Sequence, residues 1–598
     1  MADKKIIRIG CASGFWGDSA TAALQFMRAD IDYVVFDYLA EITMSLLARA
    51  RARSPEAGYA VDFIETVGLI IGEVAKRRIK LVSNAGGVNP RACAEAVRKT
   101  ARQAGVHVKV AAVLGDDLME RKTEFAAERE MFSDAPMPAA LASMNAYLGA
   151  TPIAEAFSDG AQIVITGRCV DSAVVLGPLM HEFGWKSDQH DLLAAGSLAG
   201  HLVECGPQVA GGIFTDWESV PDWDNMGYPI AECHADGRFV IAKPKGTGGL
   251  VTPATVAEQM VYEIGDPAAY LLPDVTCDFS QATLRPVGPD RVEVTGVRGL
   301  PPTDRYKVSA TYADGYRVIA TLTIIGFDAP KKARRTGEAI ITRVRRMYGE
   351  RGWPDFTETN IEVLGAEDSY GRHARHTEAR EVVLKIGVRH PNKDALELFS
   401  REIAPSAISM AQGTTGFFGG RPSVSPVIRL FSFLVHKDEL SPSIIAESGE
   451  RPCFGAASGG FVPPAAAHPA AAKPPSGDTV KVRLLELAHA RSGDKGDIAN
   501  IGVIARTPEF WPVVQQTVTP QLVADYFAHF LRGPIERFEL PGIHALNFLL
   551  HRSLGGGGIA SLRIDPQGKA YGQMLLDVEV PVAAAFARRH RLGEYKRG

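Results

Sequence analysis

A histidine, a glutamate and a cysteine lie close together in the segment AGSLAGHLVECG. His201, Glu204 and Cys205 are spaced so that all three share one face of a helix, which Gly206 would end. The imidazole and the carboxylate could transfer a proton, and a thiol beside an imidazole could act as a nucleophile. The two groups could also bind a divalent metal such as Mg²⁺ or Mn²⁺. The structural alternative is that His201 and Glu204 hydrogen-bond each other or a nearby loop.

A second candidate is the loop TGRCVDS, which follows an apolar run and carries Arg168, Cys169 and Asp171. An arginine can hold a carboxylate or a phosphate through two parallel hydrogen bonds. In the alternative, Arg168 and Asp171 pair with each other and stabilise their own turn. The sequence leaves both interpretations open.

The first glycine-rich loop, GCASGFWGDS, contains Gly14, Gly17 and Asp18, and Asp37 follows twenty residues after Gly17. Glycines let a backbone approach a phosphate at the start of a helix. The spacing differs from the dinucleotide-binding pattern G-x-G-x-x-G. We therefore expect a tight turn with an anion or carboxylate site here, and not a nicotinamide site.

A further glycine loop, KPKGTGG, combines cations with flexible backbone. Its lysines, hydroxyl and backbone donors could hold a phosphate of coenzyme A, although the loop lacks the spacing of a P-loop. A purely structural loop is the alternative. The candidate contacts are Lys243, Lys245, Gly246, Thr247 and Gly248.

Three later segments could also reach a ligand. Residues 410–423 read MAQGTTGFFGGRPS, in which Arg421 follows a glycine-rich turn and could line a cavity. Near the C-terminus, Asp494 and Lys495 lie in RSGDKGDIAN, and residues 555–558 are four consecutive glycines. Ordering glycine is entropically costly, so a run of four suggests close approach to a ligand. A turn-rich interdomain loop is the alternative for the first segment, and surface turns are the alternative for the other two.

The elements that position these residues follow from the pattern of the first 265 residues. Continuously apolar runs, such as 33–36 and 162–165, alternate with helical patterns. This pattern predicts a mostly parallel, doubly wound α/β sheet, whose loops meet at the carboxyl ends of the strands. The residues expected to converge there are Gly14, Gly17, Asp18, Asp37, Glu41, Asn84, Gly86, Gly87, Asn89, Arg168 and Asp171.

The rest of the chain divides into three parts. Residues 266–460 predict an α+β region, in which strands 306–312 and 316–325 are expected to form a hairpin through Ala-Asp-Gly. Residues 461–478, rich in proline and alanine, predict an extended linker. Residues 479–598 mix strands and helices in the proportion of a ferredoxin-like α+β domain.

Composition narrows the possible classes of protein. The chain has 598 residues and a net charge of −4, with no basic stripe, so we expect several domains and no nucleic-acid partner. No apolar run approaches the ~20 residues that span a bilayer, so no membrane partner is expected. The seven cysteines are scattered, and the N-terminus enters a strand directly, without a signal peptide. These features predict a cytoplasmic protein.

Several segments together resemble the acyclic terpene utilisation (AtuA) family. They cover residues 5–460 and read GCASGFWGD, FDYLAEITM, SNAGGVNP, ITGRCVDSA, AGHLVECG, KPKGTGGLVTPATVAEQMVYEIGDP and YLLPDV. The C-terminal part is similar to the ferredoxin-fold domain often attached to that family, through HARSGDKGDIANIGV and LNFLLHRSLGGGG.

The resemblance implies a place in the catabolism of branched acyl-coenzyme A thioesters, such as those derived from citronellol and geraniol. The role it implies is a late carbon–carbon cleavage, for example release of acetate from 3-hydroxy-3-isohexenylglutaryl-CoA. It supplies no catalytic residues. The alternatives are an acyl-CoA hydratase or hydrolase, or a non-catalytic subunit that binds acyl-CoA or assembles with other pathway enzymes. Small ferredoxin-like domains often dimerise, so we also expect a homo-oligomer.

An aldol-type cleavage needs a base for the tertiary hydroxyl and a group that stabilises the departing enolate. His201 or Glu41 could be the base, and Arg168 with the backbone donors of residues 84–87 could hold the carboxylate or the enolate. Cys205 or Cys169 could be the acid. The sequence requires no cofactor beyond the coenzyme A of the substrate, but a divalent metal could replace the cationic group, with Asp37, Glu41 and His201 as ligands. An enzyme of this kind should have Glu41, His201 and Arg168 around one cavity.

Overall fold

The computed structural model describes residues 6–415, 420–463 and 477–593, with the side chain of Glu41 excepted. The centre of its largest sheet is parallel, with strand order β1-β2-β3-β6-β4. The strands are almost continuously buried, as expected where helices cover both faces of a sheet. Their bounds are β1 (Ile6–Cys11), β2 (Tyr33–Phe36), β3 (Lys80–Ser83), β4 (Val110–Leu114) and β6 (Ile163–Thr166).

Antiparallel strands extend this sheet on both sides. β7 pairs with β1 and continues through β8 and β12 to β11, whereas β19 pairs with β4 and continues to β20. Four of these strands come from beyond residue 265, so the sheet draws on more of the chain than its N-terminal part. The bounds are β7 (Ile230–His234), β8 (Phe239–Ala242), β11 (Thr283–Gly288), β12 (Arg291–Thr295), β19 (Ser443–Ala446) and β20 (Gly449–Pro452).

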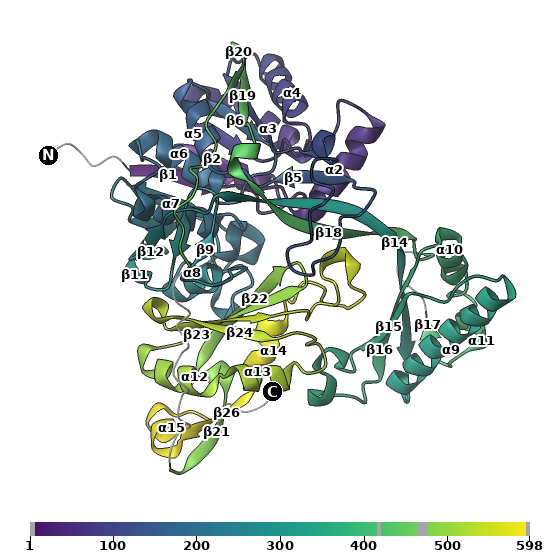
Figure 1. The fold of residues 1–598 in the computed structure, drawn as a ribbon. Helices are drawn as coiled ribbons and strands as arrows, with labels where there is room; N and C mark the ends of the chain where they lie inside the picture. Colours follow the sequence, from purple (N-terminus) through teal and green to yellow (C-terminus); the bar gives the residue numbers. More distant parts are fainter. Residues whose placement is uncertain (1–5, 416–419, 464–476, 594–598) are drawn as a thin grey trace.

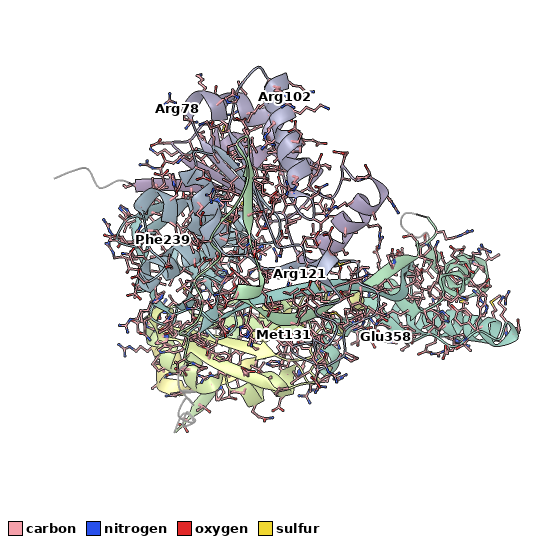
Figure 2. The ribbon with its side chains drawn as sticks, turned by 45° about the horizontal axis from the view of Figure 1, so that its top comes forward. Arg78, Arg102, Arg121, Met131, Phe239 and Glu358 are labelled. Atoms are coloured by element: carbon pink, nitrogen blue, oxygen red, sulfur yellow. The ribbon has the colours of Figure 1, made fainter. Side chains whose placement is uncertain are left out.

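Helices cover the two faces of the parallel strands and form two separate cores. One core contains α1, α3 and α4, and the other contains α5, α6, α7 and α8. The doubly wound α/β architecture is therefore confirmed. The helices are α1 (Thr21–Phe26), α3 (Val61–Arg77), α4 (Pro90–Gln103), α5 (Thr151–Ser158), α6 (Ala173–Phe183), α7 (His190–Val203) and α8 (Pro253–Met260). In Figure 2, Arg78 and Arg102 mark the ends of α3 and α4.

A long strand joins this unit to the middle region. β14 (Arg305–Ile325) pairs through its first half with β18 (Ser425–His436) and β5 (Ser143–Ala146), and through its second half with β16 (Glu381–His390). Figure 1 shows β14 and β18 running from the first unit towards the body formed by α9, α10 and β15.

The predicted hairpin at Ala313-Asp314-Gly315 is wrong. The pairing of β14 with β18 shifts register between Ala313 and Tyr316, and Gly315 has a φ of +73°. The turn residues therefore form a bulge inside one strand, because β18 and β16 supply partners on both sides of it.

Helices and shorter strands complete the middle region. The helices α9 and α10 pack on β14, β15 and β16 and form a core of their own. α2 stands apart from the other helices of the first unit and contacts β14 and β18. The bounds are α2 (Glu41–Arg53), β15 (Glu358–Leu364), α9 (Ala329–Glu350), α10 (Lys393–Arg401), α11 (Ser406–Ser409) and β17 (Thr414–Thr415).

A small sheet packs against α7. β10 (Thr276–Asp278) pairs on either side with β13 (Arg298–Leu300) and β9 (Tyr270–Leu271). This arrangement brings Tyr270 and Phe279 to the end of α7.

The C-terminal domain is a four-stranded antiparallel sheet of order β22-β23-β25-β24, with a second pair, β21 and β26. It lies below the first unit and beside the middle region in Figure 1. The strands are β21 (Thr479–Arg483), β22 (Ala488–Lys495), β23 (Ile498–Ala505), β24 (Ile535–Leu540), β25 (Ala545–Leu550) and β26 (Glu579–Ala583). The helices are α12 (Trp511–Thr517), α13 (Pro520–Tyr526), α14 (Tyr571–Leu576) and α15 (Ala584–His590).

Two buried asparagines dock this domain onto the end of α8. Asn500 donates to the carbonyl of Val261 over 2.9 Å and accepts from the backbone amide of Glu263 over 2.8 Å. Asn547 donates to the carbonyl of Gly265 over 2.7 Å. Since buried polar groups are stable only when they are paired, these bonds fix the position of the domain.

Within the described residues, no helix is both long enough and apolar enough to cross a membrane.

Candidate functional site

The carboxyl ends of three parallel strands are tied together by buried side chains. Asn84, after β3, donates to Oδ1 of Asp37, after β2, over 2.6 Å, and accepts from the backbone amide of Tyr38 over 2.8 Å. Arg168, after β6, donates to the carbonyl of Leu39 over 2.9 Å. Loops that are distant in sequence thus meet at one edge of the sheet, as the parallel topology requires.

Arg168 is held in a single orientation. Its Nη1 donates to Oδ1 of Asp171 over 2.9 Å, and its guanidinium lies 4.3 Å from the centre of the Tyr147 ring. Its backbone amide donates to Asp116 over 2.7 Å. Arg168 is 4% exposed, whereas the Asp171 side chain is 33% exposed, so Asp171 carries the pair towards the surface. The pairing of Arg168 with Asp171 is present, and the guanidinium has little freedom to take a further partner.

His201 and Glu204 form a second pair at the end of α7. Nδ1 of His201 lies 3.1 Å from Oε1 of Glu204. The imidazole packs near Tyr270 and Phe279, with ring centres 6.1 and 6.5 Å away. Among the described residues, the other ring nitrogen of His201 is buried without a hydrogen-bond partner. The histidine therefore orients the carboxyl group, which is the more exposed of the two.

The first glycine loop packs against this helix end. A Cβ atom on Gly14 would lie 2.8 Å from the carbonyl carbon of Cys205, so glycine is required for close packing. The amide of Gly14 donates to Asp18, whose other oxygen accepts from the hydroxyl of Tyr228 over 2.6 Å. Gly17 has a φ of +108° and closes the turn. These residues shape the loop and bring β1 against α7.

Asp37, Asp171 and Glu204, which we call the carboxyl cluster, share one electrostatic environment. Burial, together with the charge of Asp171, holds the pKa of Asp37 well above its usual range, although Arg168 opposes the shift. Burial also raises the pKa of Glu204, and Asp171 adds to the rise while His201 and Lys495 oppose it. Burial thus makes Asp37 and Glu204 weaker acids than usual, in a site that also contains cations.

The cysteines of the site are buried thiols. Burial raises the pKa of Cys169 to about 12 and that of Cys205 well above its usual range. A nucleophilic cysteine needs a thiolate, which forms in electropositive, partly exposed surroundings. The structure therefore does not support a nucleophilic role for Cys205, and such weak acids are poorly suited to protonate a substrate.

The C-terminal domain reaches this site through the turn between β22 and β23. Lys495 is exposed at the end of β22, and its charge acts on both Glu204 and Tyr270. The neighbouring Asp494 accepts from Gln567 over 3.3 Å and lies 3.9 Å from Lys569. Of the two residues that the sequence predicted for a site in this domain, Asp494 and Lys495, it is thus Lys495 that contributes positive charge to the carboxyl cluster.

The four glycines of residues 555–558 hold that turn in place. Asp497 accepts from the amides of Leu554 and Gly556 over 3.0 and 2.9 Å. A Cβ atom on Gly557 would lie 1.9 Å from the carbonyl oxygen of Gly496, and one on Gly558 would lie 3.1 Å from Ile42 of α2. The lack of side chains at these glycines lets their backbone touch that of Gly496 and lets residues 555–558 lie against α2.

The loop after β3 serves the fold. Asn89 caps α4 by accepting from the amide of Ala92 over 3.4 Å. A Cβ atom on Gly86 would lie 2.5 Å from the carbonyl oxygen of Thr166, so Gly86 lets the loops after β3 and β6 touch. The amides of Ala85 and Gly87 donate within the loop, to Ser83 and Asn84. These two backbone donors are therefore not available to hold an enolate.

The predicted phosphate loop is also closed on itself. Lys243 pairs with Asp290 over 3.1 Å and donates to the carbonyl of Thr247 over 2.8 Å, and the Thr247 hydroxyl donates to Pro244. A Cβ atom on Gly248 would lie 2.2 Å from the carbonyl oxygen of Asp222. Lys245 and Gly246 remain exposed at the tip of the loop.

The remaining candidates lie apart or outside the described residues. Arg421 is exposed in a bend of the middle region. Glu41 begins α2, but its side chain lies outside the described part of the structure. In the described residues, no three His, Cys, Asp or Glu side chains are grouped so that they could hold a metal ion.

A cavity of about 10 Å³ borders Arg168 and is also lined by Met44, Asn145, Tyr147, Ser309 and Thr311. It has room for about one water molecule. His201 does not line it, so Arg168 and His201 do not face each other across this cavity. They are connected instead through the carboxyl cluster, in which Arg168 binds Asp171 and His201 contacts Glu204.

Sequence reasoning missed Asp116 and Tyr270. Asp116 follows β4 at the same sheet edge, where burial raises its pKa to about 7, and the rule that selected Asp37 would also have found it. Tyr270 comes from a short strand whose position depends on tertiary packing against α7. No local sequence signal indicates it.

The sequence pattern of the family described as "Acyclic terpene utilisation family protein AtuA" matches residues 7–445. The pattern described as "AtuA ferredoxin-like domain" matches residues 482–581. No curated protein and no solved structure matches the chain.

Proposed function

The chain belongs to the acyclic terpene utilisation AtuA family and carries its ferredoxin-like domain, and on this basis we propose that it is a catabolic carbon–carbon lyase. Its substrate would be a branched 3-hydroxyacyl-CoA of the 3-hydroxy-3-isohexenylglutaryl-CoA type. The family supports a role in the utilisation of acyclic terpenes. The reaction and the thioester substrate are our inference.

The observation that carries the proposal is the carboxyl cluster. Burial raises the pKa of Asp37 and Glu204 while Arg168, His201 and Lys495 place positive charge or hydrogen bonds beside them. A carboxyl group with a raised pKa is suited to acid–base catalysis near neutral pH.

We assign the proton transfer to Glu204. Its side chain is 12% exposed, and Nδ1 of His201 orients it from 3.1 Å. In the proposed reaction the Glu204 carboxylate removes the proton of the tertiary hydroxyl, and the bond between C3 and C4 breaks, counting the thioester carbon as C1, so that the fragment with the free carboxylate departs as acetate. A ketone forms at C3, the departing fragment becomes an enolate, and Glu204 returns the proton to the enolate carbon.

Cationic groups would stabilise the negative charge of the enolate. Lys495 is exposed and its charge reaches Glu204, so it is suited to contact the free carboxylate of the departing fragment. Arg168 is already bound to Asp171 and Leu39, and it holds Asp171 in place.

The direct test is product analysis. Wild-type protein, Glu204→Gln and the control Glu338→Gln, at an exposed position of α9, would be incubated with a branched 3-hydroxyacyl-CoA and analysed by mass spectrometry. We expect cleavage by the wild type and the control, and at least a ~100-fold lower rate for Glu204→Gln. A product that differs from the substrate only by water would identify a hydratase, and thioester hydrolysis would identify a hydrolase. Binding without any conversion would contradict the enzyme proposal and support a carrier or assembly role.

A further inference from the structure

A cleft of about 480 Å³ opens between the middle region and the C-terminal domain. Its volume lies in the range of small-molecule sites. One wall comes from Arg334 of α9, from β15 and from the turn that follows β15, and the other comes from residues 529–532 and Arg563. None of its lining residues belongs to the carboxyl cluster.

The acidic side chains of the cleft are already satisfied by the protein. Asp368 pairs with Arg334 and accepts from the amide of Val363. Glu362 pairs with Lys385 over 2.5 Å, and Glu367 accepts from the amides of Arg375 and His376. Glu362 and Asp368 are thus paired with cations of their own, whereas Glu367 is held by neutral amides and keeps its negative charge in the cleft.

Two guanidinium groups on that wall have no carboxylate within ion-pair distance among the described residues. Arg532 donates to the carbonyls of Leu531 and His529 over 2.8 and 3.1 Å. Arg563 donates to the carbonyl of Ser553 and lies 4.8 Å from the centre of the Phe530 ring. Both are oriented by neutral groups and keep their full charge.

His529, on the same wall of the cleft, also lies near positively charged side chains. Its Nε2 donates to the carbonyl of Ser369 over 2.9 Å, which leaves Nδ1 as an acceptor, and within the described residues Nδ1 has no partner. Burial lowers the pKa of His529, and the charges of His373, Arg563 and Arg372 lower it further. The charges of these cations therefore act on this wall of the cleft.

We propose that this cleft binds a small, multiply charged anion of the phosphate class. Guanidinium groups match the geometry of phosphate oxygens, and here two of them line the cleft without an ion-pair partner, against one carboxylate, Glu367, that has no cationic partner in the cleft. The Phe530 ring, held by Arg563 and by stacking on Tyr571 at 5.4 Å, forms an apolar floor beside them. This site is separate from the carboxyl cluster and does not depend on the proposed lyase activity.

The test is calorimetric titration of the full chain with inorganic phosphate, compared with sodium chloride at equal ionic strength. Arg532→Glu reverses one charge of the cleft, and the matched control Arg346→Glu makes the same change at an exposed position of α9 that does not line it. We expect saturable phosphate binding that Arg532→Glu weakens by about tenfold or more and that the control leaves unchanged.

A second variant guards against an effect of Arg532→Glu on folding. Thr377 is exposed and lines the cleft, and Thr377→Trp would fill the space without removing a charge. Loss of phosphate binding in this variant, with an unchanged circular dichroism spectrum, would support the proposal. Binding that is not saturable, or that survives both cleft variants, would overturn it.

Discussion

Nδ1 of His201 and Oε1 of Glu204 lie 3.1 Å apart at the end of α7, where the imidazole is 3% and the carboxylate 12% exposed. The histidine is enclosed by Tyr270 and Phe279, whereas the glutamate is within reach of charges from Asp171 and Lys495. The buried member of the pair therefore orients the member that can meet a substrate. This division of roles leads to the first prediction.

His201→Gln should reduce turnover less than Glu204→Gln. A glutamine can still donate a hydrogen bond towards Glu204, so we expect a ~10-fold loss, against at least ~100-fold when the proton-transferring carboxyl group is removed. Steady-state kcat and KM of the two variants provide the measurement. Equal losses in both variants would show that His201 itself transfers the proton.

Lys495→Ala should shift the pH dependence of catalysis. Because the positive charge of Lys495 holds down the pKa of Glu204, its removal raises that pKa further. The acidic limb of the kcat/KM profile, where Glu204 must lose its proton, should move to higher pH. The control is Lys481→Ala, at an exposed position of β21 in the same domain. An unshifted profile in Lys495→Ala would remove this lysine from the site.

Gly557→Ala should be more damaging than Gly556→Ala. A Cβ atom on Gly557 would lie 1.9 Å from the carbonyl oxygen of Gly496, whereas one on Gly556 would first meet Ala560 at 3.5 Å. Both have positive φ, so backbone strain of ~1–3 kcal/mol opposes either substitution, and the steric overlap adds to it in Gly557→Ala. We expect Gly557→Ala to have the lower thermal midpoint and the lower activity. Equal effects would mean that the two backbones can separate without loss.

Asp116→Asn should flatten the pH dependence of stability. Burial raises the pKa of Asp116 to about 7 from a model-peptide value of 3.8, so between these values folding of the wild type takes up a proton. The stability that this carboxyl group contributes is complete below the unfolded pKa and is lost as the pH rises towards about 7. Its removal should eliminate a dependence of up to about 1.4 kcal/mol per pH unit.

In a chain of this size that dependence corresponds to a change in Tm of only about 1 °C per pH unit. The midpoints of the wild type, Asp116→Asn and the exposed control Asp188→Asn would therefore be compared at pH 5, 6 and 7 by scanning calorimetry. Identical slopes in all three would show that Asp116 ionises normally in the folded protein.

The convergence of these loops at one edge of the sheet could be predicted, because it depends only on which segments form parallel strands. Once the runs ending before Asp37, Asn84 and Arg168 are recognised as parallel strands, right-handed crossovers place their loops together. No contact between those side chains had to be known in advance. The pairing of Arg168 with Asp171, one of two alternatives, was decided only by the structure.

Other features depend on pairing between distant segments. The tripeptide Ala313-Asp314-Gly315 has the composition of a turn, but β16 and β18 provide partners that keep the strand continuous. Likewise, the composition of its loop makes Lys243 a candidate phosphate ligand, but Asp290, from the turn between β11 and β12, pairs with it. Local sequence reports what a segment can do, and long-range contacts select among those options.

The continuity of β14 has a consequence for how the chain can be divided or recombined. The backbone hydrogen bonds of one strand belong to both the first unit and the middle region, so no cut near residue 313 yields two intact pieces. The C-terminal domain is attached differently, through side chains such as Asn500 and Asn547, and its own strands pair only with one another in the described residues. It can therefore be gained, lost or exchanged in evolution as a module, whereas the first two parts must be inherited together.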